Sequence, residues 1–154
     1  TANGLMNLVV PVEQFRNHTP VAEIKVDYAT DWQRVHEHAI RSAYGKSAFF
    51  EFYADKILPI YEAQPEYLTE WNETCLSAVS SLLKLNLNIQ TSTEYVDANI
   101  QNDLRSFDFK VKPEAKAVYT QVFMERHVFH SGLSVLDLLF CCGPESKEIL
   151  SRSL

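Results

Sequence analysis

The chain has 154 residues, of which 46% are hydrophobic and 22% are charged, and this is the composition of a globular protein. Its length is that of one domain, so we expect residues 1–154 to form a single domain. The formal net charge of −6 argues against a nucleic-acid partner, because such partners bind to basic surfaces. The longest strongly apolar run, residues 133–142, has about half of the roughly 20 residues that a membrane-spanning helix needs, so no membrane span is expected.

The cysteines and the start of the chain point to its setting. Cys75, Cys141 and Cys142 make an odd count without a C-x-x-C pair, and a disulfide between the adjacent two would be strained. We therefore expect a reducing, cytoplasmic location. The chain begins at Thr1 without a methionine, and Asn3-Gly4 has the sequence of a hairpin turn. A strand that would precede this turn is missing, so we expect a domain that is truncated at its N-terminus.

The first 28 residues have the pattern of strands. Residues 5–12 form a β-rich run that ends near Pro11, and residues 21–28 alternate between apolar and polar side chains, as in a half-buried strand. The same alternation returns near residues 87–95. These three segments predict a small antiparallel sheet. The fold class that we expect is therefore α+β, mainly helical, with this sheet beside the helices.

Helical periodicity accounts for most of the rest of the chain. The predicted helices run from a capping box at Thr30 and Gln33 to Gly45, from Ser47 to about Ile57, from Glu66 to Lys84, and from Val135 to Cys142 behind a cap at Ser134. A further helical face is expected just before His127, and a short last helix after Gly143. Residues 97–116 have little periodicity and are expected to form a long loop, a feature that is often functional or disordered.

The segment from Asp31 to Tyr61 is dense in tryptophan, histidine, tyrosine and phenylalanine rings. A surface helix has no use for so much aromatic area, so this segment is expected to form a core or the wall of a pocket. Trp32, His36 and Ile40 fall on one face of its first helix. Two interpretations of His36 stay open: a buried neutral histidine bonded to backbone, or a pocket-facing acid, base or ligand.

No set of metal ligands is complete. His36 and His38 are two residues apart and point to different sides of a helix. His127 and His130 could meet only on a helix that continued past Phe129. We therefore expect no metal ion and no cofactor.

The remaining candidates have ordinary explanations beside the chemical ones. Cys141 and Cys142 are candidate nucleophiles without an evident base, so packing is favoured for both. Asp137 fits the first turn of a capped helix without any catalytic role. Lys46 and Ser47 lie where a helix is expected to begin and form a candidate anion site, although the glycine-rich loop of a phosphate-binding motif is missing.

Several short blocks of sequence stand in a fixed order along the chain. They are Trp32-x3-His36, Ala39-Ile40-x-Ser42-Ala43-Tyr44-Gly45-Lys46-Ser47, Pro59-x-Tyr61, Thr93-Glu94-Tyr95, Asp103-Leu104-Arg105, Tyr119-x-Gln121-Val122-Phe123, Leu133-Ser134-Val135-Leu136-Asp137-Leu138-Leu139-Phe140 and Gly143-Pro144-Glu145. Together they span almost the whole chain and resemble the WbqC-like family of bacterial proteins. Three departures from the usual family pattern are Glu37 for a tryptophan, Ser131-Gly132 for Pro-Asn, and Cys141-Cys142 for Asn-Glu.

The resemblance implies a function in the biosynthesis of bacterial cell-surface polysaccharides of the O-antigen type. Such a protein would be a cytoplasmic transferase that attaches an amino-acid or acyl group to a sugar, and its partner would be a small molecule, a nucleotide-sugar or an acyl donor. On this hypothesis the catalytic residues are His36 and Asp137, and the substrate contacts are Trp32, Tyr44, Lys46, Ser47 and Arg105. His36 would accept a proton, while Lys46 and Arg105 would contact anionic groups.

A rival hypothesis is a non-enzymatic protein that holds a transferase of the same pathway in a complex. It predicts an exposed apolar patch of several hundred Å² in place of a polar pocket. The sequence leaves the substrate and the oligomeric state open, a homo-oligomer included.

Overall fold

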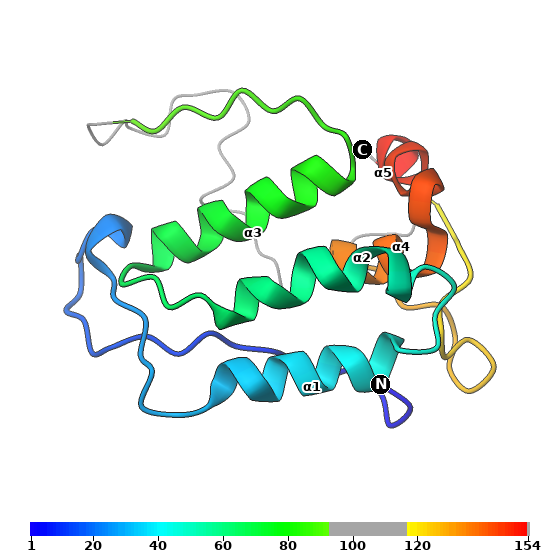
Figure 1. Ribbon diagram of the computed structural model, residues 1–154, viewed down its shortest axis with the longest axis horizontal. Helices are drawn as coiled ribbons and strands as arrows, with labels where there is room; N and C mark the ends of the chain where they lie inside the picture. Colours follow the sequence, from blue (N-terminus) through cyan, green and yellow to red (C-terminus); the bar gives the residue numbers. More distant parts are fainter. Residues whose placement is uncertain (93–116, 154) are drawn as a thin grey trace.

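Three helices run side by side in alternating directions and form the body of the structure (Figure 1). The structure is a computed structural model that describes residues 1–92 and 117–153. Its elements in chain order are η1 (Val21–Glu23), α1 (Trp32–Tyr44), α2 (Phe50–Ile57), η2 (Leu58–Glu62), α3 (Leu68–Leu82), α4 (Val135–Cys142), η3 (Gly143–Glu145) and α5 (Ser146–Ser153), where η marks a 3-10 helix. α2 and its extension η2 lie between α1 and α3, and α4 packs against α2.

Side chains four residues apart place one face of α1 in the interior. Trp32, His36 and Ile40 are 5%, 5% and 3% exposed. Ala39 and Ala43 beside them are half-buried. The apolar face predicted for this helix is therefore confirmed, and it gives α1 a fixed orientation against the rest of the protein.

Two apolar clusters hold the helices together. The smaller one joins Trp32 of α1 to Trp71 of α3 and to Val26 of the preceding segment. The larger one contains Ile40, Phe50, Ala54, Ile57, Leu58, Leu83, Leu139 and Phe140. Because the two clusters meet α1 at different points along its length, burial of apolar surface on both fixes the whole helix.

The predicted antiparallel sheet is wrong, because no strand occurs in residues 1–92 or 117–153. Residues 5–12 and 21–28 meet only in an isolated bridge between Val12 and Val26, and a second isolated bridge joins Lys25 to Tyr67. The described part of the chain is helical and not α+β. Residues 93–95 of the third predicted strand lie outside the described residues, as does the predicted loop 97–116, and the rest of that strand is not formed.

Proline and competing contacts explain why the alternating segments do not extend into strands. The carbonyl of Pro11 accepts a hydrogen bond of 3.0 Å from the backbone N–H of Asp27, but Pro11 has no N–H to return. Pro20 precedes the 3-10 turn η1, which occupies the first residues of the predicted strand 21–28. Residues 4–10 line a cavity beside α1 and do not pair with a neighbouring strand.

The start of α1 differs from the predicted capping box. Asp31 is the residue before the helix, and no side chain caps it there. The side-chain amide of Gln33 donates hydrogen bonds of 2.6 and 2.7 Å to the carbonyls of Tyr61 and Ala63. The glutamine that was expected to cap its own helix therefore ties α1 to the end of η2.

The other predicted helix limits have mixed outcomes. The helix predicted to begin at Ser47 begins instead at Phe50, as α2. The prediction that Ser47 lies at a helix N-terminus is therefore wrong. The helix expected just before His127 is not formed, because residues 122–127 form turns and a bend. The cap at Ser134 is confirmed, since its hydroxyl oxygen accepts a hydrogen bond of 3.3 Å from a backbone N–H in the first turn of α4.

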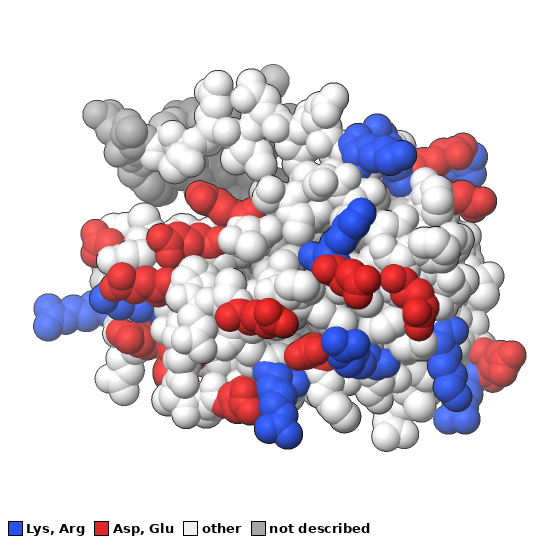
Figure 2. Space-filling model, in the orientation of Figure 1, with Lys and Arg blue, Asp and Glu red and all other residues white. Residues whose placement is uncertain are grey.

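None of the helices in the described part of the chain is both long enough and apolar enough to cross a membrane. On the face of the molecule in Figure 2, Asp and Glu side chains lie between the Lys and Arg side chains, and the described residues form no extended basic area on that face.

Candidate functional site

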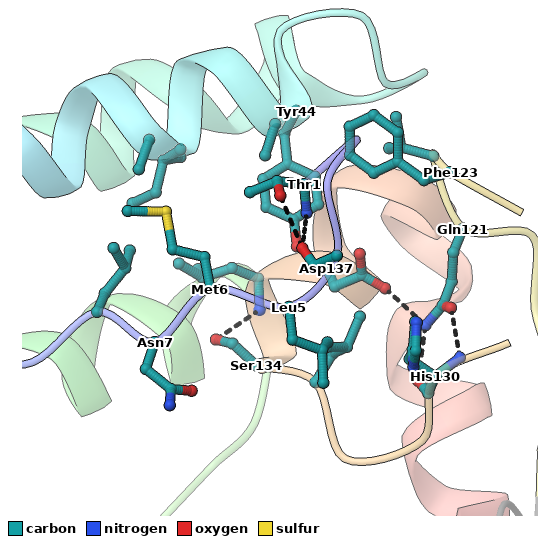
Figure 3. Close-up of a pocket in the computed structure, with 18 of the residues that line it drawn as sticks. Thr1, Leu5, Met6, Asn7, Tyr44, Gln121, Phe123, His130, Ser134 and Asp137 are labelled. Carbon is teal, nitrogen blue, oxygen red and sulfur yellow. Dashed lines mark hydrogen bonds between the residues drawn. The ribbon is translucent and has the colours of Figure 1, made fainter. Parts of the chain in front are cut away.

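A cavity of about 760 Å³ opens between the N-terminal segment, α1 and the chain from residue 121 to residue 137 (Figure 3). It is lined by Thr1, residues 4–10, His36, Ala39, Ile40, Ala43, Tyr44, Tyr61, Trp71, residues 121–123, His127, Val128, residues 130–134, Leu136 and Asp137. Most of these side chains are apolar. Among the described lining residues, Asp137 is the only Asp, Glu, Lys or Arg.

A buried carboxylate lies at one end of the cavity. Asp137, in the first turn of α4, is 3% exposed. Its Oδ2 accepts a hydrogen bond of 2.7 Å from the hydroxyl of Tyr119 and one of 3.2 Å from the side-chain amide of Gln121. The hydroxyl of Tyr44, from α1, lies near Asp137, close enough for the carboxylate to raise the pKa of the hydroxyl. Both donors are neutral groups, so the carboxylate receives hydrogen bonds but no counter-charge from them.

The two tyrosine hydroxyls in this cluster keep their protons. Burial raises the pKa of Tyr44, and the negative charge of Asp137 raises it further. Burial likewise raises the pKa of Tyr119, to which Asp137 also contributes, while a hydrogen bond with Gln121 opposes the shift. Both hydroxyls therefore stay protonated at neutral pH. That of Tyr119 donates to the carboxylate, and the oxygen of Tyr44, which lines the cavity, has acceptor capacity for a ligand.

Gln121 closes the loop that forms one wall of the cavity. Its side-chain Nε2 donates a hydrogen bond of 2.9 Å to the carbonyl of His130, and its Oε1 accepts one of 2.9 Å from the backbone N–H of the same residue (Figure 3). Gln121 therefore holds both the loop and the carboxylate of Asp137. Neither Tyr119 nor Gln121 was expected in the site. The Tyr119-x-Gln121 block of the family resemblance was the signal that could have found them.

His36 lies at a second end of the cavity, among aromatic rings. The centroid of its ring is 5.0 Å from that of Trp32 and 5.8 Å from that of Tyr61, with an edge-on geometry in both cases. Burial lowers the pKa of His36, and a hydrogen bond with the backbone of Val9 partly offsets this. The imidazole is therefore neutral at pH 7 and can accept a proton. His36 is both buried and part of the cavity wall.

The two residues expected to be catalytic do not contact each other. His36 and Tyr44 are eight positions apart on α1, which corresponds to about 12 Å along the helix axis. Since Tyr44 lies close enough to Asp137 for the carboxylate to raise its pKa, Tyr44 marks the carboxylate end of the cavity. The cavity is therefore long enough to place one part of a ligand against the rings and another part against the carboxylate.

The other expected contacts lie elsewhere. Trp32 is buried behind the cavity wall, where its indole N–H donates a hydrogen bond of 3.0 Å to a backbone carbonyl. The side chain of Lys46 is exposed, and the hydroxyl of Ser47 donates a hydrogen bond of 2.7 Å to the carbonyl of Tyr44. Neither Lys46 nor Ser47 lines the cavity. Arg105 lies outside the described residues.

Cys75, Cys141 and Cys142 are free thiols. Burial raises the pKa of Cys141 to about 12, and the charge of Asp137 contributes to the same shift. Burial also raises the pKa of Cys75 and that of Cys142. A raised pKa leaves little of the thiolate that nucleophilic attack requires. In residues 1–92 and 117–153, no group of three His, Cys, Asp or Glu side chains is placed to hold a metal ion.

Comparison with known proteins identifies the family of this chain. Residues 1–110, which include α1 with His36 and Tyr44, match the WbqC-like protein family. The chain belongs to this family. The WbqC-like match covers the N-terminal and α1 walls of the cavity, whereas the wall from residue 121 to residue 137 lies beyond it.

A curated relative extends the similarity over almost the whole chain. The uncharacterized protein Rv1507c of Mycobacterium tuberculosis is 29% identical in an alignment 180 positions long, which covers 97% of this WbqC-like chain and 78% of the relative. No solved structure matches the chain.

Proposed function

We propose that this WbqC-like protein works in the cytoplasm, in the biosynthesis of a bacterial cell-surface polysaccharide of the O-antigen type, where it transfers an amino-acid or acyl group to a sugar. One observation carries the proposal: a single cavity contains a neutral buried histidine at one end and a buried carboxylate at the other. The resemblance to the WbqC-like family supports the pathway, and the cavity volume of about 760 Å³ suits a small-molecule ligand.

In the proposed reaction, a hydroxyl or amino group of the sugar attacks the carbonyl carbon of an activated thioester donor. A bond forms between that carbon and the sugar oxygen or nitrogen, and the bond between the carbon and the thioester sulfur breaks. His36 accepts the proton that the sugar loses and passes it to the departing sulfur, so that a thiol is released. The lowered pKa of His36 suits this role, because the imidazole is unprotonated before the reaction begins.

The remaining cavity residues have positioning roles in this proposal. The rings of Tyr61 and Trp71 line the His36 end and offer an apolar surface to the face of a sugar. Tyr44 and Asp137 bind polar groups at the opposite end. No Lys or Arg lines the described cavity, so the phosphates of a nucleotide-sugar would lie outside it, with Lys46 and Arg105 as their proposed contacts.

Product analysis by mass spectrometry tests the proposal. The full chain is incubated with aminoacyl or acyl thioesters and nucleotide-sugars, and the mass of the sugar is expected to rise by that of the transferred group. His36→Gln should slow transfer by about 100-fold or more, which is the usual contribution of a general base. His38→Gln, an exposed position of the same helix, is the matched control and should keep the wild-type rate. Unchanged transfer in His36→Gln, or no product with any pair, would reject the proposal.

A second candidate function is a non-enzymatic partner of a transferase in the same pathway. It is supported by apolar side chains at the cavity that face solvent: Leu5, Met6, Val9 and Val128 are 54%, 51%, 69% and 81% exposed. On this alternative Val128→Asp abolishes co-purification with the transferase, while His36→Gln has no effect on the pathway. Under the enzymatic proposal the two variants have the opposite effects: His36→Gln impairs the pathway more than Val128→Asp does.

A further inference from the structure

We propose that the polar end of the cavity binds a primary ammonium group, which contacts the carboxylate of Asp137 directly. This inference rests on the proposed function, because it specifies a chemical property of the substrates of that same site. It favours an amino-acid group, with its free amine, over an uncharged acyl group as the transferred unit, or an amino sugar as the acceptor.

The distribution of charge in the cavity is the first argument. Asp137 is the only Asp or Glu among the described lining residues, and no Lys or Arg lies among them. None of the ion pairs between described residues includes Asp137. A carboxylate that is almost fully buried and has only neutral donors lacks most of the solvation that water gave it. A cationic ligand group supplies the missing counter-charge, whereas a phosphate or a carboxylate would be repelled.

The arrangement of acceptors is the second argument. An ammonium group has three N–H donors and no acceptor. At this end of the cavity it meets the carboxylate of Asp137 and the hydroxyl oxygen of Tyr44, both of which line the cavity. Gln121 holds the carboxylate through a hydrogen bond of 3.2 Å. The acceptors are thus in place before a ligand arrives.

Thr1 also reaches this end of the cavity, but its nitrogen is bonded to a partner other than Asp137. Thr1 lines the same part of the cavity, and its amino group donates a hydrogen bond of 2.9 Å to the carbonyl of Gly4 (Figure 3). Beyond the carboxylate, the walls are apolar, with Leu5, Phe123 and Leu136 among them. The site therefore fits an ammonium group attached to an apolar body, as in the ester of an amino acid such as leucine.

Calorimetric titration of the full chain at low ionic strength tests the inference. The probes are leucine methyl ester and N-acetyl-leucine methyl ester, which differ in the charge of the amine, together with glucosamine and N-acetylglucosamine. Each free amine should bind at least about tenfold more tightly than its acetylated form, which is the effect expected for one charge-assisted hydrogen bond. Preference for the leucine ester assigns the ammonium to the transferred group, and preference for glucosamine assigns it to the acceptor.

Two variants separate the site from non-specific charge effects. Asp137→Asn keeps the shape of the side chain and removes its charge, so the preference for the free amine should disappear. Glu125→Gln makes the same change at an exposed position outside the cavity and should leave that preference intact. Tyr44→Phe, which removes one acceptor, should weaken binding of the amine by a smaller factor. Equal binding of amine and acetylated probes, or an unchanged preference in Asp137→Asn that still has the wild-type far-UV spectrum, would overturn the inference.

The same titrations distinguish this inference from the proposed function. If the free amine binds through Asp137 but no transfer product forms, the inference stands and the transferase proposal fails. If uncharged acyl groups are transferred as fast as aminoacyl groups and no amine preference exists, the transferase proposal stands and the inference fails.

Discussion

The hydroxyl of Tyr119 donates a hydrogen bond of 2.7 Å to Oδ2 of Asp137, across 18 positions of the chain. It ties the segment that carries Gln121 to the first turn of α4. A carboxylate with so little exposed surface depends on such donors, because each one replaces a hydrogen bond that water made in the unfolded chain. The contact therefore supports both the stability of the fold and the geometry of the cavity.

Removing this donor should destabilise the protein. We expect Tyr119→Phe to lower the free energy of unfolding by about 1–3 kcal/mol, since it leaves a buried charge with one donor fewer. Urea unfolding monitored by tryptophan fluorescence measures the change. Tyr53→Phe is the matched control, because the hydroxyl of Tyr53 has no hydrogen-bond partner among the described residues and its loss should be nearly neutral. Equal effects of the two variants would contradict the role assigned to Tyr119.

The buried imidazole of His36 should make stability depend on pH. Burial lowers the pKa of His36 from its ordinary value of 6.5, so the unfolded chain binds a proton more readily than the folded one. The contribution of the neutral His36 imidazole to the free energy of unfolding is therefore fully present above pH 6.5, and it is lost as the pH falls below 6.5 toward the folded-state pKa. Unfolding in urea between pH 7.5 and pH 5 should show a smaller loss of stability in His36→Gln than in the wild type. His38→Gln, at an exposed position, should follow the wild-type curve.

Local patterns in the sequence were sufficient for the elements whose contacts are local. Trp32, His36 and Ile40 recur every four residues, and this period alone identified the buried face of α1. Ser134 was recognisable as a cap because it bonds to a backbone group two residues away. Both predictions needed only the geometry of one helix.

The failures have a common cause in contacts between distant parts of the chain. The alternation in residues 21–28 is real, but Val26 and Lys25 find single partners at Val12 and Tyr67, which lie in different segments. Period-two patterning specifies a face and not a partner, so it could not exclude this outcome.

The candidate site was predictable only in part for the same reason. The sequence singled out His36 and Asp137, and the structure brings both to one cavity. The structure places Lys46 at the surface and not in the cavity, because α2 begins later than the sequence pattern indicated. Tyr119 reaches Asp137 through turns that have no regular period.

The cap of α4 should contribute measurably to stability. We expect Ser134→Ala to lower the free energy of unfolding by about 1 kcal/mol, the usual cost of losing a serine N-cap. Ser77→Ala, at an exposed position inside α3, is the control and should have little effect, since alanine is the better helix former. A null result for Ser134→Ala would show that packing alone fixes the start of α4.

The thiol of Cys141 should be slow to react. Its pKa of about 12 leaves a very small thiolate fraction at pH 8, so alkylation by iodoacetamide should be far slower in the folded chain than in urea. Peptide mass spectrometry after timed quenching measures the rate at each cysteine. Rapid labelling of Cys141 in the folded protein would contradict this account and would return that residue to the list of candidate nucleophiles.

The central claim is that the cavity beside α1 binds a ligand with a free amine. Its most direct test is a titration of methyl-labelled alanine residues by NMR with leucine methyl ester as the ligand. Ala39 and Ala43 line the cavity, whereas Ala54 of α2 and Ala78 of α3 lie away from it. If the cavity is the binding site, the methyl signals of Ala39 and Ala43 should shift in a saturable way and those of Ala54 and Ala78 should stay in place. In Asp137→Asn the same titration should require a much higher ligand concentration. Saturable shifts confined to Ala54 or Ala78, or no shift at any of the four at millimolar ligand, would contradict the account.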